Sequence, residues 1–496
     1  MFESAELHHK IDKKTWDATV PKLRADLLDV QYQLLEAKRF PVVILINGVE
    51  GAGKGETVNL LSEWMDPRHI QTHAFAAPSE EERAHPPMWR FWQALPPKGK
   101  IGIYFGNWYT DAVVQRVAGN IKMSEFDRQL SEIKRFEKML ADEGALLFKF
   151  WFHLSKADQK VRLRELEKDP KTRWRVTEAD WRRFKQYDHY VEVSEHALRT
   201  TSQGYAPWLV IPGNDARFRS VEVGTILLDS IRKRLKWKGD TTQRISAAPI
   251  VRAIDHTNAL NSLDLGKKIA KKKYDEQLET WQGKLNLLSR HEKFKDRSLI
   301  LLFEGNDAAG KGGAIRRVTQ ALDARQYQIV PVAAPTDEER AQPYMWRFWR
   351  RVPGRGRVAI FDRSWYGRVL VERVEGYCSE ADWMRAYGEI NDFEDQLCSS
   401  GAIIVKFWLT ISQEEQLRRF KEREKTRFKR FKITEEDWRN RKKWPQYEAA
   451  ICDMVDRTST EIAPWTLVEA NDKNHARIKV LKTVCERLEA ALKSKK

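Results

Sequence analysis

The chain has few cysteines and no long hydrophobic run. All of its cysteines lie in the second half of the sequence, without CxxC or histidine-paired spacing: Cys378, Cys398, Cys452 and Cys485. This pattern argues against a disulfide framework and against a structural zinc site. The first residues lack the apolar core of a signal peptide, and no apolar run reaches the length of a membrane span. We therefore expect a soluble, cytoplasmic protein with no membrane partner.

Positive charge is what the chain has in excess. Lys and Arg number 88 against 71 Asp and Glu, a formal net charge of +17. Such a surplus indicates a polyanionic partner, whether nucleic acid, a phosphorylated small molecule, an anionic surface or an inorganic polyanion. Hydrophobic residues make up 42% of the 496 residues, which is enough for packed cores. The length exceeds that of one ordinary domain.

The sequence repeats itself once. The segment APSEEERAHPPMWRFW at residues 77–92 matches APTDEERAQPYMWRFW at 334–349, a shift of 257 residues (334 minus 77). The shift holds without a gap from the forties to about Asp215, which predicts two copies of one fold. Residues 238–264 lose apolar periodicity and gain polar residues, as linkers do. We expect a first domain at 1–245 and a second at 246–496.

Each copy carries the pattern of an α/β domain. Leu23, Leu27, Val30 and Leu34 fall three and four residues apart, which predicts an amphipathic helix. The continuous apolar run VVILIN follows in the first copy and LILLFE in the second, as in strands buried on both faces. Further apolar runs alternate with helical stretches. The pattern predicts a parallel sheet sandwiched by helices in each copy.

A phosphate loop follows the first strand of the second copy. The spacing of Gly305, Gly310 and Lys311 satisfies G-x-x-x-x-G-K between a buried strand and a helix. Such a loop directs backbone N–H groups and the helix N-terminus at one phosphate, while the lysine reaches a second. The candidate phosphate-binding residues are Gly305, Asn306, Asp307, Ala308, Ala309, Gly310, Lys311 and Gly312. Gly312 replaces the usual Ser or Thr that ligates magnesium, so Asp307 is a candidate for that oxygen, or else a helix cap.

A second acidic residue ends the apolar run VAIFD. Asp362 is placed to enter the cleft at the carboxyl end of a parallel strand, where P-loop enzymes hold magnesium. The guanidinium of Arg363 can grip a phosphate with two hydrogen bonds. The alternative is an Asp–Arg ion pair that only closes a turn. Phe105 and Gly106 occupy these two positions in the first copy.

These motifs, together with a basic helical segment, carry a family resemblance. With GNDAAGKGG at 305–313, FDRSWYGRVLVERV at 361–374 and ISQEEQLRRFKERE at 411–424, the chain resembles the polyphosphate kinase type 2 family over about residues 15–235 and 270–496. The resemblance implies a thymidylate-kinase-like P-loop fold with a helical basic lid. It also implies Mg²⁺ as cofactor and phosphoryl transfer between inorganic polyphosphate and a nucleotide. For fused two-domain members it implies conversion of AMP to ADP.

The resemblance also assigns roles to single residues. It places the phosphate loop on Gly305, Asp307, Gly310 and Lys311, the second motif on Asp362 and Arg363, lid arginines on Arg419 and Arg423, and a further basic residue on Lys432. The implied catalytic residues are Lys311, Asp362, Arg363, Arg419 and Arg423, and the implied magnesium ligands are Asp307 and Asp362. Arg419 and Arg423 are four residues apart, hence on one helical face. A basic run of this kind is also typical of a solvated face.

The first copy loses the charges that would face phosphate. Glu50 replaces the loop aspartate, Leu166 replaces Arg423, and Ala216 and Ser220 replace two basic residues near the C-terminus. Glu56 adds a carboxylate that disfavours a bound polyphosphate. The apolar framework and the MWRFW segments persist, and we expect those aromatics to serve core or subunit packing rather than base stacking. The first domain is therefore expected to keep its fold and to lack catalysis.

The expected function is Mg²⁺-dependent transfer of a terminal phosphoryl group from inorganic polyphosphate to AMP, giving ADP, in the second domain. An ATP-dependent nucleoside monophosphate kinase is an alternative, against which the missing Ser or Thr and the basic lid argue. Polyphosphate-driven phosphorylation of ADP or GDP is another. A non-enzymatic nucleic-acid binder would explain the charge but not the loop, so no nucleic-acid partner is expected. The resemblance and the duplicated aromatic segments suggest a homodimer.

Overall fold

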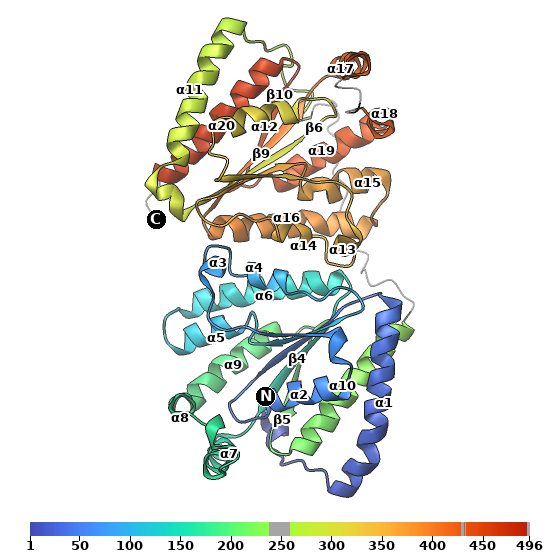
Figure 1. The fold of residues 1–496 in the computed structure, drawn as a ribbon, viewed down its shortest axis with the longest axis vertical. Coiled ribbons are helices and arrows are strands. Elements are labelled where there is room, and N and C mark those ends of the chain that lie inside the picture. Colours follow the sequence, from blue (N-terminus) through green and yellow to red (C-terminus); the bar gives the residue numbers. More distant parts are fainter. Residues whose placement is uncertain (238–257, 428–430, 432, 494–496) are drawn as a thin grey trace. The chain divides into compact units, whose positions relative to one another are not determined.

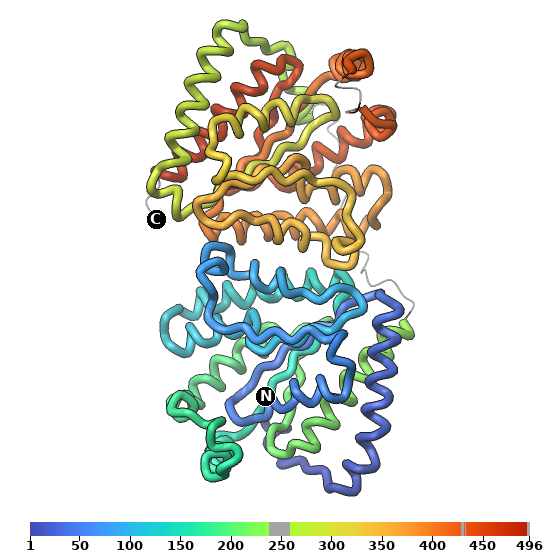
Figure 2. Tube along the Cα trace, in the orientation of Figure 1, coloured from blue at the N-terminus to red at the C-terminus, as the bar shows by residue number. Residues whose placement is uncertain are grey.

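The computed structural model describes residues 1–237, 258–427, 431 and 433–493. They form two compact units, one built mainly from residues before 238 and the other mainly from residues after 257. We call residues 1–237 the first repeat and residues 258–493 the second repeat (Figures 1 and 2). The expected domain boundary between 245 and 246 lies outside the described residues. Division of the chain at that point stays a prediction.

Each repeat contains a five-stranded parallel sheet. The strand order is β2-β3-β1-β4-β5 in the first repeat and β7-β8-β6-β9-β10 in the second. The strands of the first sheet are β1 (Val42–Gly48), β2 (Ile70–Ala74), β3 (Ile101–Phe105), β4 (Leu146–His153) and β5 (Trp208–Pro212). Those of the second are β6 (Ser298–Gly305), β7 (Tyr327–Pro331), β8 (Val358–Asp362), β9 (Ala402–Thr410) and β10 (Trp465–Glu469). The register repeats as well, because Val42 pairs with Ile101 and Leu299 with Val358.

Helices cover both faces of each sheet (Figure 1). The helices of the first repeat are η1 (Glu3–Glu6), α1 (Lys13–Ala37), α2 (Lys54–Trp64), η2 (Pro67–His69), α3 (Glu80–Arg83), α4 (Trp89–Gln93), α5 (Thr110–Val117), α6 (Met123–Asp142), α7 (Lys156–Lys168), η3 (Arg173–Arg175), α8 (Glu178–Lys185), α9 (Tyr187–Thr201) and α10 (Ala216–Lys236). Helices α1, α2 and α10 pack together on one face, and α5, α6 and α9 on the other.

The second repeat is covered in the same way. Its helices are α11 (Lys271–Ser289), η4 (Glu292–Asp296), α12 (Lys311–Thr319), α13 (Asp337–Arg340), α14 (Trp346–Trp349), η5 (Trp365–Val369), α15 (Val371–Glu375), α16 (Glu380–Ser399), α17 (Gln413–Lys425), α18 (Glu435–Lys442), α19 (Trp444–Thr458) and α20 (Lys473–Lys493). Helices α11, α12 and α20 pack on one face, and α15, α16 and α19 on the other. Two parallel sheets between helices confirm the predicted α/β fold.

The pattern of buried residues explains why the sheets form. Strand β6 is buried from Ser298 through Glu304, as expected of a central strand between helical layers. In α1, the predicted stripe of Leu23, Leu27, Val30 and Leu34 is buried throughout. Removing each such side chain from water contributes about 1.5–3 kcal/mol. The hydrophobic spacing therefore fixes which face of α1 packs against α2 and α10.

Each repeat buries a Glu–Lys pair that joins a strand to a helix. In the second repeat, Lys406 of β9 lies 2.7 Å from the carboxylate of Glu394 in α16, and both side chains are almost fully buried. Trp365 Nε1 and Tyr366 Oη donate to the other oxygen of Glu394 at 3.0 and 2.7 Å. Glu137 and Lys149 make the same arrangement in the first repeat. The network fixes the segment that directly follows Asp362.

Several aromatic residues of the two MWRFW segments pack against residues of their own repeats. Trp349 contacts Phe393 edge-on, with ring centroids 4.8 Å apart, and Phe348 meets Trp365. In the first repeat Trp92 contacts Phe136 in the same manner. These contacts support the expected packing role rather than a platform for bases.

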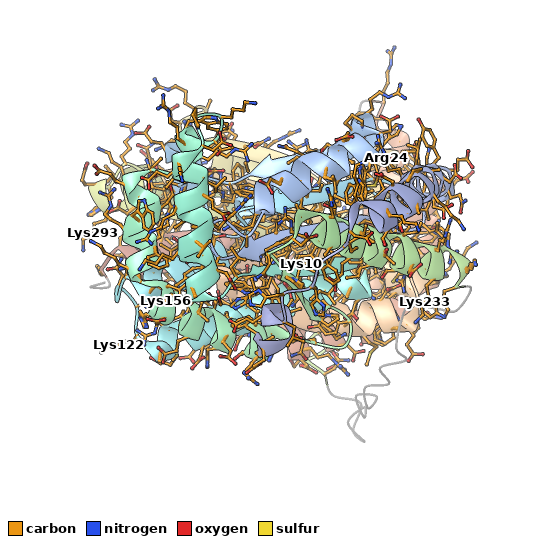
Figure 3. The ribbon with its side chains drawn as sticks, turned by 90° about the horizontal axis from the view of Figure 1, so that it is seen from below. Lys10, Arg24, Lys122, Lys156, Lys233 and Lys293 are labelled. Atoms are coloured by element: carbon orange, nitrogen blue, oxygen red, sulfur yellow. The ribbon has the colours of Figure 1, made fainter. Side chains whose placement is uncertain are left out.

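Much of the excess positive charge is exposed on the surface. The side chains of Lys10, Arg24, Lys122, Lys156 and Lys233 are exposed on the first repeat (Figure 3). In the part of the chain that the structure describes, none of the helices combines the length and the apolar character that a membrane span requires.

Candidate active site

The phosphate loop of the second repeat connects β6 to α12. Gly305 ends the strand at φ +147°, and a Cβ atom there would lie 2.5 Å from the carbonyl oxygen of Leu409, so only glycine fits. Gly310 precedes the helix in the left-handed region, with φ +110°. The Nζ of Lys311 donates to the carbonyl oxygen of Gly305 at 2.8 Å. The lysine thus bends back over a loop whose helix offers free N–H groups to an anion.

The second acidic motif lies beside the loop at the end of the neighbouring strand. Asp362 ends β8 and pairs in register with Phe303 of β6. Arg363 adopts φ +64°, which is uncommon for a residue with a side chain and is typical of functional sites. Its Nη2 lies 3.7 Å from Oδ1 of Asp307. The guanidinium therefore connects the second motif to the phosphate loop.

A cavity of about 650 Å³ lies over both motifs. Its basic lining residues are Lys311, Arg316, Arg317, Arg363, Arg419, Arg423, Lys473 and Arg477, and its acidic ones are Asp307, Asp362, Glu422 and Asp437. With twice as many cations as carboxylates, the cavity favours a polyanion. An adjoining cavity of about 290 Å³ shares Arg419, Lys473 and Arg477 with it and adds Arg418. The basic lining therefore extends past the loop.

The structure brings most of the predicted site residues to this cavity. The loop from Asp307 to Gly312 lines it, together with Asp362 and Arg363. Gly305 and Asn306 instead support the loop from below, since the side chain of Asn306 accepts from the N–H of Ile411 at 3.2 Å. Lys432 lies outside the described residues, so its role stays a prediction.

Arg419 lines the cavity but is almost fully buried, at 2% exposure. Its Nη1 donates to the carbonyl oxygens of Ala308 and Ala309 at 2.9 and 3.0 Å, and its Nη2 to those of Ala470 and Asn471 at 2.8 Å each. The guanidinium therefore joins the phosphate loop to the segment after β10. Its Nε also forms an ion pair with Oε1 of Glu415 at 2.5 Å. The expected contact of this side chain with phosphate stays a prediction.

Glu304 was not predicted as a site residue. Its carboxylate is buried at the end of β6 and accepts from Ser364 Oγ at 2.8 Å. Burial raises the pKa of this carboxyl, while the hydrogen bond from Ser364 and the nearby Lys311 oppose the shift. Through Ser364 it connects the phosphate loop to the second motif. A comparison of the two repeats could have identified Glu304 and Ser364 as site residues. The first repeat has Asn47 and Asn107 at the equivalent positions, 257 residues earlier.

The lid helices are α17 and α18. Asn440 of α18 donates to Oδ2 of Asp307 at 3.0 Å, and Gln416 of α17 donates to the carbonyl oxygen of Asp307 at 3.2 Å. Arg423 of α17 and Asp437 of α18 line the cavity. Burial and the nearby carboxylate of Asp307 raise the pKa of Asp437. Both lid helices are thus in contact with the loop.

The acidic residues suit a magnesium ion shared with a phosphorylated substrate. Asp307 and Asp362 line one cavity, and among the described residues no cluster of three or more His, Cys, Asp or Glu is arranged to hold a metal by itself. Mg²⁺ is usually bound by one or two carboxylates together with substrate phosphates and water. Two hard oxygen donors beside a phosphate loop fit that requirement.

The first repeat keeps the geometry of the loop but not the charges of the second motif. Gly53 precedes α2 at φ +87°, and Lys54 Nζ donates to the carbonyl oxygen of Gly48 at 2.8 Å. Phe105 ends β3 with a partly exposed ring, and Gly106 follows at φ +74°. The position of Asp362 therefore carries no metal-binding group in this repeat.

The model of the family described as polyphosphate kinase 2 matches the chain twice, at residues 10–239 and 268–496. A polyphosphate:AMP phosphotransferase of Pseudomonas aeruginosa is 59% identical over 496 residues, which is 100% of each chain. One of Acinetobacter johnsonii is 38% identical over 476 residues, or 95% of this chain and 96% of the relative. A crystal structure from Pseudomonas aeruginosa PA01 assigned as polyphosphate kinase 2 superimposes with a TM-score of 0.91 at 57% identity, covering 100% of both chains.

Proposed function

The chain belongs to the polyphosphate kinase 2 family, and from this premise we propose that it transfers a terminal phosphoryl group from inorganic polyphosphate to AMP, giving ADP. The observation that carries this proposal is the basic cavity of the second repeat, in which the phosphate loop, Asp362 and Arg363 meet. Its surplus of cations suits a donor with one negative charge or more per phosphate unit. The full-length match to two polyphosphate:AMP phosphotransferases supports AMP as the acceptor.

The reaction requires little covalent chemistry from the protein. An oxygen of the AMP phosphate attacks the terminal phosphorus of the polymer, and the bond from that phosphorus to the bridging oxygen breaks. The shortened polyphosphate leaves with that oxygen. Because the second pKa of a phosphate monoester is about 6, the attacking oxygen is already deprotonated near neutral pH and needs no general base. Catalysis then rests on positioning and on charge stabilisation.

We assign that work to the groups around the cavity. The N–H groups at the start of α12 and the ammonium of Lys311 hold phosphate oxygens. Arg363 and Arg423 neutralise the charge that spreads over the equatorial oxygens in the transition state. Arg419 acts as a positioning residue, because its donors hold the loop backbone. Closure of the lid excludes water and thereby suppresses hydrolysis of the polymer.

We propose Mg²⁺ as the cofactor, held by Asp362 with Asp307 assisting. When bound, the ion would neutralise charge on the phosphate groups of the substrates. Because Gly312 supplies no hydroxyl, we assign the ion to the carboxylates of Asp307 and Asp362, which line the same cavity. Arg363 holds Asp307 beside the second motif, and Asn440 fixes its other oxygen.

The experiment that tests this function compares phosphoryl donors. Purified protein is incubated with AMP, Mg²⁺ and either polyphosphate or ATP, and ADP formation is followed by chromatography. We expect ADP with polyphosphate. ADP with ATP alone would indicate a nucleoside monophosphate kinase, and no ADP from polyphosphate would refute the proposal. Replacing AMP by ADP or GDP tests the alternative acceptors.

Two properties of the whole chain complete the proposal. Catalysis resides in the second repeat, and the first is non-catalytic. We also propose a homodimer located in the cytoplasm, which light scattering of the purified protein and cell fractionation test directly.

A further inference from the structure

The first repeat holds a carboxylate where the second has none. Glu56 lies in the first turn of α2, at the position of Gly313 in α12. Three guanidinium groups surround its carboxylate. Arg219 Nη2 lies 2.7 Å from Oε2, while Arg175 Nη1 and Arg162 Nη2 lie 3.1 and 3.3 Å from Oε1. A surface ion pair normally joins one carboxylate to one cation, whereas three arginines contact the carboxylate of Glu56.

These three arginines come from the elements that would enclose a ligand. Arg162 lies on α7, the counterpart of lid helix α17, Arg175 lies on η3, and Arg219 lies on α10. Guanidinium groups converging on the first turn of a helix form the environment that binds phosphate. Glu56 supplies the negative charge that this environment requires.

A second carboxylate, that of Glu50, contacts the other lid helix of the first repeat, α8. Glu50, at the position of Asp307, lies 3.4 Å from Lys54 Nζ and 3.1 Å from Nη1 of Arg183 in α8. In the second repeat the residue at the position of Arg183 is Asn440. Both lid helices of the first repeat are therefore held on the loop by its own carboxylates.

Arg219 also fills space that is open in the second repeat. A Cβ atom on Gly53 would lie 2.1 Å from the guanidinium carbon of Arg219, whereas one on Gly310 would meet nothing within 4 Å. Nη1 of Arg219 donates to the carbonyl oxygens of Ala52 and Gly213 at 3.3 and 3.0 Å. Its Nε is buried without a hydrogen-bond partner among the described residues. The site therefore keeps a buried donor that its own carboxylates leave unused.

We propose that the loop, α2 and lid of the first repeat form a latent binding site for inorganic polyphosphate, in which Glu56 occupies the place of a phosphoryl group. The site carries four cations, Lys54, Arg162, Arg175 and Arg219, and Glu56 neutralises the three guanidinium groups from within. The repeat thereby holds its lid closed without a ligand. This proposal goes beyond the reaction assigned to the second repeat.

The test counts binding sites on the full-length chain. Glu56→Gly gives the first repeat the residue of the second, and isothermal titration with inorganic tripolyphosphate measures sites per chain. We expect one site more than in the native chain. Equal counts in the two proteins would overturn the proposal. The comparison is a difference between two chains, so it stands whether or not the second repeat forms ADP from polyphosphate.

Matched variants locate the new site. Glu63→Gly makes the same change of charge and helix propensity on α2, and should add no site; an added site there would overturn the proposal. Adding Arg219→Ala to Glu56→Gly should remove the extra site, and its persistence would count against the assigned location. Glu56→Gln keeps helix propensity and side-chain size, so it should reveal the same site even where the glycine variant folds poorly.

Discussion

Lys311 and Lys54 take equivalent positions in two loops, but only Lys311 borders the cavity with both acidic motifs. Lys311→Ala removes a charge that stabilises the transferring phosphate, and we expect kcat to fall by a factor of about 10²–10³, a barrier increase of roughly 3–4 kcal/mol. Lys54→Ala should leave kcat nearly unchanged. Initial rates of ADP formation measure both. Loss of most activity in a folded Lys54→Ala protein would show that the first repeat is catalytic or tightly coupled.

Arg419 and Arg219 reach equivalent carbonyl oxygens from different helices. Arg419 of α17 bonds those of Ala309 and Ala470, and Arg219 of α10 bonds those of Ala52 and Gly213, which are 257 residues earlier. The residue at the position of Arg219 in the second repeat is Ala476. Both repeats thus use a buried guanidinium to join the loop to the last strand.

This equivalence predicts a rescue of stability without rescue of activity. Arg419→Ala leaves buried carbonyl oxygens without donors, and we expect a loss of about 1–3 kcal/mol in unfolding free energy as well as most of kcat. Adding Ala476→Arg should restore much of the melting temperature, because the new guanidinium can reach the same carbonyl oxygens. It should not restore kcat, since its side chain crosses the phosphate cavity. Recovery of full activity in the double variant would contradict this view.

At the scale of elements, the buried Glu394–Lys406 pair holds the segment after Asp362 in place. Burial raises the pKa of Glu394 and lowers that of Lys406, and their mutual attraction opposes both shifts. Glu394→Gln leaves a buried ammonium without its counter-charge, and we expect a destabilisation of about 3–5 kcal/mol. Denaturant unfolding followed by fluorescence measures it.

The first repeat provides the matched control for that variant. Glu137→Gln breaks the equivalent pair with Lys149 and should destabilise the first repeat by a similar amount. It should leave kcat of the folded enzyme unchanged, whereas Glu394→Gln should lower kcat. Equal effects of the two variants on kcat would refute a positioning role for Glu394.

The sequence predicted the elements well because their signals are local. Continuous apolar runs such as VVILIN become buried strands, and the stripe from Leu23 to Leu34 becomes the buried face of α1. The internal shift of 257 residues also predicted that the two sheets would match. Glycine spacing identified the loop because the tight approach at Gly305 admits no side chain.

The contacts of long polar side chains were harder to predict. Helical spacing put Arg419 and Arg423 on one face, but it did not show that Arg419 ends on backbone carbonyl oxygens. Glu304 ends the apolar run LILLFE just as Asp362 ends VAIFD, but its burial and its hydrogen bond from Ser364 could not be predicted from the run itself. Arg219 was missed because its role is taken by Arg419, from another helix, in the second repeat. Such contacts depend on tertiary packing rather than on sequence pattern.

On the scale of the whole molecule, the net charge is +17. Some of the cationic side chains are exposed on the general surface, and others line the cavity. Lys122 and Lys233 belong to the exposed group (Figure 3). Exposed charges separated by more than about 8–10 Å are screened at physiological ionic strength, so they add little to the binding of one ligand. Cations that line the cavity act on phosphates at contact distance.

This division predicts how salt affects the two substrates. The Michaelis constant for polyphosphate should rise more steeply with KCl between about 50 and 200 mM than that for AMP, because a longer polyanion releases more counterions when it binds. Lys473→Ala should reduce the slope of log KM against log salt for polyphosphate by about one, as expected for one phosphate contact. Lys233→Ala should leave the slope unchanged. Equal slopes for the two substrates, or an equal effect of the two lysine variants, would show that polyphosphate is held by the general surface charge and not by the cavity.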